Sequence, residues 1–332
     1  MNVIILKKDD ICKIFSMKDA IKACRDALKI YSEGGSSIPL RTNIDIAGKG
    51  GQSLYMPGYA EGANALGIKI VSVYPNNVKR GLTAVPSTMV LLDEETGMVN
   101  SIIDGTYLTQ IRTGAVSGAA TDILARKDSA VLALIGTGGQ AESQLDAVLS
   151  VRDIKEVRIH SKNIEHARKF ADKMREKYKY KPSIEITAVL SSGEAVTGAD
   201  IITTVTTSMQ PTFDGRLIKK GAHINGVGSY TPAMQELDEW TLLNADKVYV
   251  DTRDGVLNES GDFIIPMKEG KFTKDIVTGE LGEVILGKVP SRENEDEVTL
   301  FKTVGSSILD IVTSRRIYEK ALASRIGKVV EI

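Results

Sequence analysis

A glycine-rich turn is the stretch of this 332-residue sequence whose residue types and spacing most directly suggest ligand binding. An apolar run at 131–135 leads into Gly136, Gly138 and Ala141, and an amphipathic stretch at 142–149 follows. Gly136 permits a sharp turn, Gly138 lets the backbone approach a pyrophosphate, and small Ala141 lets a helix pack closely on a strand. The predicted cofactor-binding residues of this strand–turn–helix are Gly136, Thr137, Gly138, Gly139, Gln140 and Ala141. The alternative, a glycine-rich connection that binds nothing, fits this context less well.

The residues after the next predicted strand, 156–160, bear on which dinucleotide binds. An acidic residue at that strand end would accept hydrogen bonds from the adenosine ribose and repel a 2′-phosphate. Ser161 and Lys162 stand there instead, and a hydroxyl with an ammonium attracts a phosphate. The sequence therefore favours NADP(H), with NAD(H) possible. The alternative is that Lys162 is only a solvated loop lysine.

The elements around the turn predict a doubly wound sheet. Between 128 and 251 short apolar runs alternate with helical stretches, a pattern typical of a parallel sheet in an α/β fold. The predicted strands are 131–135, 156–160, 184–188, 201–204, 223–227 and 247–250, with helices at 142–150 and 164–177. We therefore expect a Rossmann domain, which binds its cofactor at the strand ends.

The leading part of the chain has a different texture. A helix should begin at Ser16, with Asp19 completing a capping box, and end at Gly34. Short strand-like runs at 43–46, 53–56, 67–73 and 87–93 then alternate with turns, which predicts a mostly antiparallel sheet. A strand at 98–103, a helix at 106–124 and a terminal helix at 309–322 complete the prediction, while 255–297 is charged and loop-rich.

Composition excludes several classes of function. Lys and Arg number 42 against 43 Asp and Glu, a net charge of −1, which gives no electrostatic footprint for nucleic acid or an acidic membrane surface. No apolar run approaches the roughly 18 residues of a membrane span. The N-terminal apolar run is too short for a signal peptide, so we expect a cytoplasmic protein.

Cysteine and histidine usage gives no sign of a metal site. Cys12 and Cys24 lack a close ligand spacing and are predicted to be buried free thiols. His160, His166 and His223 fall in unrelated elements, so no metal cluster or nucleophilic triad is predicted.

Several segments together resemble the ornithine cyclodeaminase/mu-crystallin family. They are Arg41, 67–69, 110–115, 135–141, 205–208, 225–229, 236–238 and 301–305. The resemblance spans nearly the whole chain and keeps the order of the motifs. It implies an α+β substrate-binding and dimerisation domain at 1–124 with 312–332, a Rossmann domain at 125–311, and a homodimer.

The resemblance also implies site residues. Those matching Arg41, Lys69 and Arg112 surround the substrate carboxylate in the family. Further residues that line the dinucleotide are Thr113, Val205, Thr206, Thr207, Val227, Gly228 and Ser229. The residue types suit these roles, since a guanidinium grips a carboxylate bidentately and a buried lysine has a lowered pKa and exchanges protons.

One position departs from the ornithine cyclodeaminases. They carry an aspartate where ungapped alignment places Tyr230, and a phenol cannot deprotonate the distal amine of ornithine at neutral pH. Asp238 is instead predicted to start a helix. We therefore predict an NAD(P)H-dependent oxidoreductase that interconverts a small amino acid and its imine, as a ketimine reductase or alanine dehydrogenase does. The alternatives are ornithine cyclodeaminase with recycled NAD, and a ligand-carrying protein without turnover.

Overall fold

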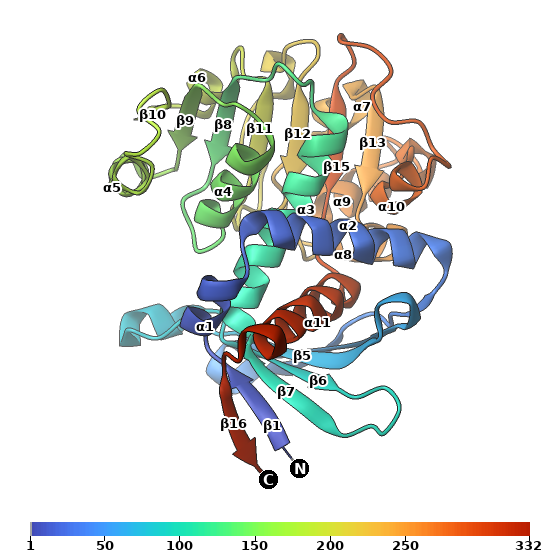
Figure 1. Cartoon of the computed structure of the whole chain (residues 1–332). Helices are drawn as coiled ribbons and strands as arrows, with labels where there is room; N and C mark the ends of the chain where they lie inside the picture. The colour runs from blue at the N-terminus through green and yellow to red at the C-terminus, as the bar shows by residue number, and fades with distance from the viewer. Residues whose placement is uncertain (1) are drawn as a thin grey trace. The chain divides into compact units, whose positions relative to one another are not determined.

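The computed structural model describes residues 2–332 and divides into two compact units. The first comprises Met1–Arg112 and Ser306–Ile332, and the second comprises Thr113–Gly305. The chain leaves the first unit within helix α3 (Gly105–Leu124) and returns to it after strand β15 (Thr299–Lys302). The path can be followed by colour in Figure 1. The roles predicted for domains at 1–124 with 312–332 and at 125–311 stay predictions.

The first unit is built on an eight-stranded sheet in the order β16-β1-β7-β6-β5-β4-β2, with β3 also paired to β4. Among the described strands of this sheet, only β1 and β7 pair in parallel, so the predicted antiparallel character is confirmed. The strands are β1 (Asn2–Leu6), β2 (Ser36–Ser37), β3 (Thr42–Ile46), β4 (Gly51–Ala60), β5 (Ala65–Val73), β6 (Ser87–Leu92), β7 (Val99–Asp104) and β16 (Lys328–Glu331).

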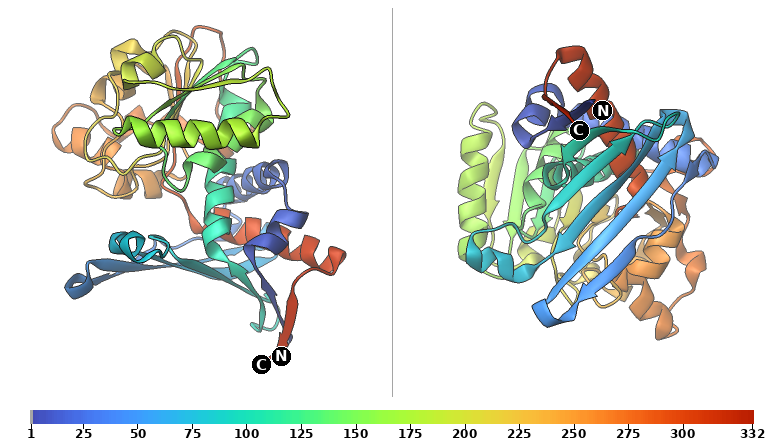
Figure 2. Two further views of the ribbon diagram at one scale, coloured as in Figure 1. Left: turned by 90° about the vertical axis from the view of Figure 1, so that its left-hand side faces the viewer. Right: turned by 90° about the horizontal axis from the view of Figure 1, so that it is seen from below.

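One face of this sheet is covered by the terminal helix α11 (Ser307–Ser324), which packs on β4, β5 and β6. Strand β5 shows the resulting alternation, because Lys69 and Val71 are buried while Ile70 between them is exposed. The right-hand view of Figure 2 looks onto the other face, where the long strands are in plain sight. Lys69 therefore occupies a position that the strand period assigns to the core.

Helix α2 (Met17–Glu33) begins and ends at the predicted residues. The Ser16 hydroxyl accepts the Asp19 N–H, the Asp19 carboxylate accepts the Ser16 N–H, and Gly34 takes the left-handed conformation at the C-cap with φ 84°. Its buried face includes Cys24, and α2 also packs on α11. The capping pattern thus fixes the helix that lies against the terminal one.

The second unit contains an eight-stranded sheet in the order β10-β9-β8-β11-β12-β15-β13-β14, with every neighbouring pair parallel. Its strands are β8 (Val131–Ile135), β9 (Glu156–His160), β10 (Glu185–Ala188), β11 (Ile201–Thr204), β12 (His223–Gly226), β13 (Lys247–Val250), β14 (Gly279–Glu280) and β15. Helices α4 (Ala141–Val151) and α5 (Ile164–Lys177) follow β8 and β9. The predicted Rossmann-type parallel sheet is confirmed.

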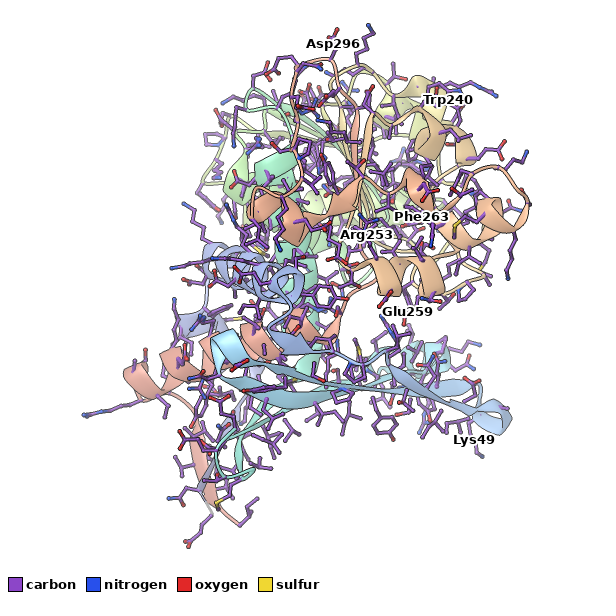
Figure 3. All side chains as sticks on the ribbon, turned by 90° about the vertical axis from the view of Figure 1, so that its right-hand side faces the viewer. Lys49, Trp240, Arg253, Glu259, Phe263 and Asp296 are labelled. Atoms are coloured by element: carbon purple, nitrogen blue, oxygen red, sulfur yellow. The ribbon has the colours of Figure 1, made fainter. Side chains whose placement is uncertain are left out.

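Both faces of this sheet are buried, as a doubly wound fold requires. Leu132 and Leu134 of β8 belong to one apolar cluster, with residues of α4 and α5. Ala133 and Ile135 point to the opposite cluster, which contains Phe263, labelled in Figure 3. Alternate side chains of β8 therefore pack into two apolar clusters, one on each face of the sheet.

The segment predicted to be loop-rich, 255–297, contains more regular structure than expected. It forms most of α8 (Arg253–Glu259), α9 (Gly261–Lys268) and α10 (Leu281–Ile285), and apolar residues of α8 and α9 enter the second cluster. Charged residues such as Arg253 and Glu259 (Figure 3) stand among the apolar residues of these short helices, so the apolar faces are not evident from the sequence.

One expectation about the cysteines was wrong, and three strands were not predicted. Cys12 is exposed, since it lies one residue beyond the buried Ile11 on the short helix α1 (Lys8–Ile14), while Cys24 is buried as predicted and both thiols are free. The strands β14, β15 and β16 were not predicted. Across residues 2–332, no helix combines the length and apolar character of a membrane span.

Candidate active site

The glycine turn lies at the carboxyl end of β8 and leads into α4. Gly136 has φ 110°, and a Cβ there would lie 2.5 Å from the Val205 carbonyl oxygen, so that only glycine fits. A Cβ at Gly138 would meet nothing within 4 Å, and Gly138 is exposed. Ala141 is fully buried at the start of α4. The turn thus combines a closed side against the sheet with an open side that a phosphate can approach, which fits a dinucleotide.

Two neighbouring strand ends meet the turn. The Val205 N–H donates to the Ile135 carbonyl at 2.8 Å, directly before Gly136. A Cβ at Gly228 would lie 2.1 Å from the Thr206 carbonyl oxygen, so the segments after β11 and β12 touch through bare backbone. The structure therefore brings together the glycine turn, Val205, Thr206 and Gly228 at the carboxyl edge of the sheet.

The remaining predicted cofactor residues border the same edge. The Gly136 N–H donates to the His160 carbonyl at 2.9 Å, which places Ser161 and the exposed Lys162 at the end of β9. The Thr113 carbonyl accepts a hydrogen bond from the Gln144 amide of α4 at 3.0 Å. Thr207 is exposed, Val227 is mostly buried and Ser229 is fully buried.

A buried carboxylate joins the segments after β11 and β12. Glu236 accepts the N–H of Thr206 at 2.5 Å, of Gly228 at 2.5 Å and of Ser229 at 3.2 Å, and the Thr204 hydroxyl at 3.1 Å. Burial raises the pKa of Glu236, while hydrogen bonds from the backbone favour its charged form. Sequence reasoning included Glu236 in a motif but gave it no role.

A second buried acid extends this network. Asp262 accepts the N–H of Glu236 at 2.7 Å and of Leu237 at 3.0 Å, and its other oxygen lies 2.8 Å from Nζ of Lys302. Asp262 and Lys302 are both fully buried. Lys302 therefore balances one of the two buried acids, Glu236 and Asp262, beneath the strand ends.

The first unit holds the predicted substrate residues. Lys69 is 1% exposed and stands on β5 directly between Met56 of β4 and Met89 of β6, whose side chains share its face of the sheet. Its Nζ donates to Oδ2 of Asp310 at 2.6 Å. Asp310 lies in α11 and is fully buried.

Arg112 of α3 joins the same carboxylate. Its Nε lies 2.9 Å from Oδ1 of Asp310, at ion-pair distance but without the angle of a hydrogen bond. Arg41, which precedes β3, is half-buried, and its charge acts on Lys69. The structure therefore brings Lys69 and Arg112 together on one acid that the sequence analysis did not name.

The electrostatics of Lys69 favour proton exchange. Burial lowers the pKa of the Lys69 amine to about 7, because desolvation disfavours the ammonium and outweighs the opposing effect of Asp310. The charges of Arg112 and Arg41 contribute to this lowering of the pKa. Lys69 is thus poised to gain or lose a proton near neutral pH.

The family follows from comparison with known sequences. The model of the ornithine cyclodeaminase/mu-crystallin family matches residues 1–325. The chain belongs to this family. The predicted family is therefore confirmed. The matched range includes both the glycine turn and the array of Lys69, Arg112 and Asp310.

Several of the similar proteins are reductases or dehydrogenases. Delta(1)-pyrroline-2-carboxylate reductase of Bacillus thuringiensis subsp. konkukian (strain 97-27) is 38% identical over 329 residues, 99% of this chain and 100% of that protein. The structure of Thermococcus litoralis Delta(1)-pyrroline-2-carboxylate reductase in complex with NADH and L-proline is 42% identical, covers 99% of this chain and 100% of that chain, and gives a TM-score of 0.94. An archaeal alanine dehydrogenase dimer with bound NAD is 32% identical, covers 100% of both chains, and gives 0.92.

Tyr230 is the position at which the sequence departs from the ornithine cyclodeaminases. Tyr230 is partly buried and packs against the apolar cluster of Phe263. Asp238 is the N-cap of α7 (Glu239–Asn244), where its carboxylate accepts the Thr241 N–H, and it also accepts the Gly215 N–H. Asp238 therefore starts a helix, as predicted.

Proposed function

We propose that this member of the ornithine cyclodeaminase/mu-crystallin family is an NAD(P)H-dependent reductase that interconverts a small amino or imino acid and its imine. Reduction of a cyclic ketimine such as pyrroline-2-carboxylate and reductive amination of the alanine-dehydrogenase type both fall within this class. The observation that carries the proposal is the buried array of Lys69, Arg112 and Asp310, in a chain that also has the glycine turn. The names of the similar proteins support the same class of reaction.

Each residue of the array has a chemical role in this proposal. Arg112 and Arg41 hold the substrate carboxylate, because a guanidinium offers paired N–H donors to two carboxylate oxygens. Lys69 hydrogen-bonds the substrate nitrogen and exchanges a proton with it, which its pKa of about 7 allows at physiological pH. Much of the rate enhancement then comes from orientation, since a protonated imine is already electrophilic.

The cofactor part of the proposal concerns the second unit. The glycine turn, Thr113, Val205 to Thr207 and Val227 to Ser229 hold the dinucleotide, which supplies or removes the hydride when bound. We favour NADP(H), because Ser161 and Lys162 follow β9 and the nearby Glu165 is paired with Arg168 at 2.7 Å. NAD(H) is the other cofactor that this site suits.

Cofactor preference has a direct test. Fluorescence titration should give a lower Kd for NADPH than for NADH, and Lys162→Asp should reverse the order, because an acid repels the 2′-phosphate and binds the ribose hydroxyls. The exposed Lys49 (Figure 3) supplies a control, since Lys49→Asp makes the same charge change in the first unit. Equal Kd values for both cofactors in the wild type would refute the preference.

A spectrophotometric screen tests the reaction itself. NADH and NADPH are each mixed with pyrroline-2-carboxylate, piperideine-2-carboxylate, or pyruvate plus ammonia, and cofactor absorbance is followed. We expect oxidation of the cofactor with at least one imine, and its loss in Lys69→Met but not in Lys49→Met. Ammonia and proline from ornithine with no net cofactor oxidation would instead identify ornithine cyclodeaminase. Tight cofactor binding without any turnover would identify a carrier.

Assembly and location complete the proposal. We expect a homodimer, since one of the similar structures is a dimer, and light scattering should give twice the mass of the chain. We also expect residence in the cytoplasm, because the buried thiol of Cys24 is unpaired, as is typical of a reducing compartment. A fluorescent fusion that fractionates outside the cytoplasm would contradict the second expectation.

A further inference from the structure

We infer that Asp310 is a positioning residue of the proposed reaction: its carboxylate fixes the Lys69 amine and the Arg112 guanidinium in one array and keeps a proton on Lys69 for delivery to the imine nitrogen. This inference rests on the proposed function. It adds to that function a residue that is far from the other two in the sequence and is supplied by the terminal helix α11.

The two oxygens of Asp310 serve different cations. Oδ2 accepts the Lys69 ammonium at 2.6 Å, and Oδ1 lies 2.9 Å from Nε of Arg112. Arg112 thus lies against Asp310 through Nε, and in this proposal its Nη groups bind the substrate carboxylate. With Asp310 fully buried and both cations at most 5% exposed, water screens this array poorly. A shift of the carboxylate would therefore move both cations.

The charges around Lys69 explain why an anion is needed. Arg112 from α3 and Arg41 from the segment before β3 both oppose a proton on Lys69, and so does burial between Met56 and Met89. From α2, Cys24 faces the same cluster, but burial raises the pKa of its thiol to about 12, so it carries no charge at neutral pH. Asp310 favours the ammonium both by its charge and by its hydrogen bond.

The proton transfer balances with hydride transfer. In reduction, the imine carbon accepts a hydride from the reduced cofactor and the imine nitrogen accepts a proton from the Lys69 ammonium. The C=N π bond is replaced by one C–H and one N–H bond, the cofactor is oxidised, and the neutral amine of Lys69 takes a proton from solvent. Asp310 takes no part in these bond changes, and its charge favours the return of Lys69 to the protonated form.

The pH dependence of Asp310→Asn tests this assignment. Loss of the anion should shift the Lys69 titration toward acid by about one pH unit or more. The alkaline limb of kcat/KM for imine reduction should move with it, so that activity at about pH 8 falls roughly fivefold more than at about pH 6. Amine oxidation needs neutral Lys69, so its acid limb should also move to lower pH.

A second readout does not depend on activity. The NMR signal of Lys69 in protein labelled with 13C at lysine Cε, assigned by its absence in Lys69→Met, reports the same titration without substrate. If the wild type reduces no imine, the proposed function fails, whereas this titration still tests the link between Asp310 and Lys69. Wild-type limbs and a wild-type Lys69 titration in folded Asp310→Asn would overturn the inference.

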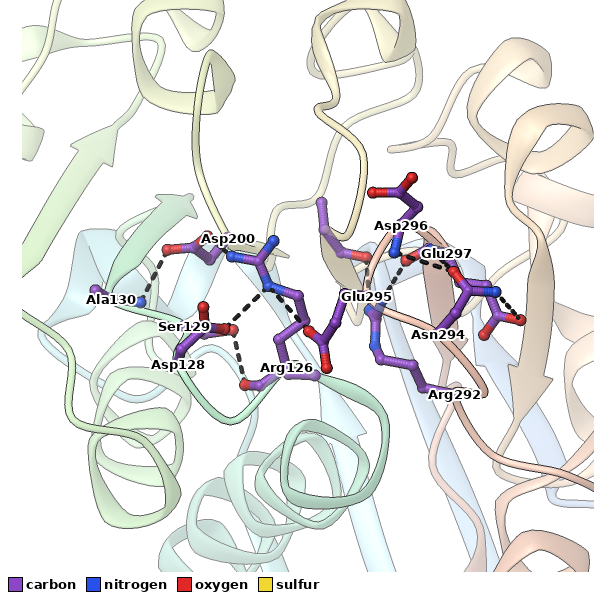
Figure 4. Close-up of polar contacts among 12 residues, drawn as sticks. Arg126, Asp128, Ser129, Ala130, Asp200, Arg292, Asn294, Glu295, Asp296 and Glu297 are labelled. Atoms are coloured by element: carbon purple, nitrogen blue, oxygen red, sulfur yellow. Dashed lines mark hydrogen bonds and ion pairs between the residues drawn. The ribbon is translucent and has the colours of Figure 1, made fainter.

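Two variants separate positioning from folding. Asp310→Glu keeps the charge but displaces it, so we expect the pH limb of the wild type with kcat lowered at least about tenfold; a wild-type kcat would overturn the positional role. Asp200→Asn is the matched control, because Asp200 is a buried carboxylate of the second unit that binds Arg126 at 3.0 Å (both labelled in Figure 4) and Lys219 at 2.6 Å. It should lower the melting temperature without moving the limb.

Discussion

At the scale of single residues, the site depends on a charge placed where the strand period demands an apolar side chain. Lys69 alternates with exposed neighbours on β5 and faces α11, yet it carries an amine into the core. A buried amine is tolerated only with a partner, and Asp310 provides one at 2.6 Å. A polar residue that breaks a buried pattern and is satisfied by a distant acid is typical of a functional position.

Arg112 offers a direct test of the carboxylate site. Arg112→Ala should lower kcat/KM for imine reduction about 100-fold or more, since the substrate carboxylate loses a charged, paired partner. Arg112→Lys should restore only part of this loss, because an ammonium lacks the planar pair of donors. The Kd for NADPH should stay within about twofold of the wild type, because the glycine turn is unchanged. Wild-type turnover in Arg112→Ala would remove the assignment.

His223 predicts a component of acid sensitivity. It is fully buried on β12, and its ring nitrogens contact Thr299 at 2.9 Å and Asn225 at 3.1 Å. Burial, helped by the charge of Arg292 shown in Figure 4, lowers the pKa of His223 from 6.5 to about 3. Between these values the unfolded chain binds a proton that the folded chain does not, so the stability provided by neutral His223 is present above about pH 6.5 and lost toward pH 3.

Chemical denaturation as a function of pH measures this component. His223→Gln should remove roughly 3–5 kcal/mol from the loss of unfolding free energy on going from neutral to acid pH. The exposed His166 provides the control, and His166→Gln should leave the pH dependence as in the wild type. An unchanged pH dependence in His223→Gln would show that other groups govern acid unfolding.

At the scale of elements, the proposed cofactor site is an edge where strands β8, β11 and β12 end together. Backbone contacts hold this edge closed, because Gly136 meets Val205 and Gly228 meets Thr206 with no room for side chains. The carboxylate of Glu236 collects the N–H groups that would otherwise be unpaired there. The segments after β11 and β12 thereby fix the orientation of the glycine turn and of its open side.

Gly138→Ala tests the open side of the turn. A Cβ at Gly138 meets nothing within 4 Å, so the variant should keep the melting temperature of the wild type without cofactor. Its Kd for NADPH should rise at least about tenfold, because the new methyl group keeps the backbone from the pyrophosphate. Gly48→Ala, also in open space, should change neither quantity. Unchanged NADPH binding in Gly138→Ala would place the phosphates elsewhere.

Much of this edge could be predicted because its signals are local. The bounds of β8, β9, β11 and β13 agree with the sequence prediction, since each is a short apolar run between turns. Strand β15 was not predicted, because Thr299–Lys302 ends in a lysine and gains strand character only by inserting between β12 and β13. Pairing with distant strands decides such segments, and one sequence does not reveal it.

The same distinction separates the predicted and missed site residues. Lys69 and Arg112 were indicated by family motifs, whereas Asp310 stands 241 residues beyond Lys69. Its only sequence signal is an acid among the apolar residues Ile308 to Val312 of the terminal helix. A search for charged residues within apolar helical runs would have found it, but not the partner that it binds.

At the scale of the whole molecule, cofactor binding should be linked to stability. NADPH at about 100 times its Kd should add about 2.7 kcal/mol to the unfolding free energy of the part that binds it. Differential scanning calorimetry measures this gain, and Gly138→Ala should lose about half of it or more at the same concentration. A gain of equal size in Gly138→Ala would mean that the turn does not bind the cofactor.

The first unit is assembled from both extremities of the polypeptide: β1 pairs with β16, and Lys69 meets its acid on α11. Translation runs from the N-terminus, so a growing chain carries an unmatched amine on β5 until the ribosome has delivered Asp310. A nascent or prematurely terminated product therefore lacks this array, and only a chain translated past Asp310 can acquire it.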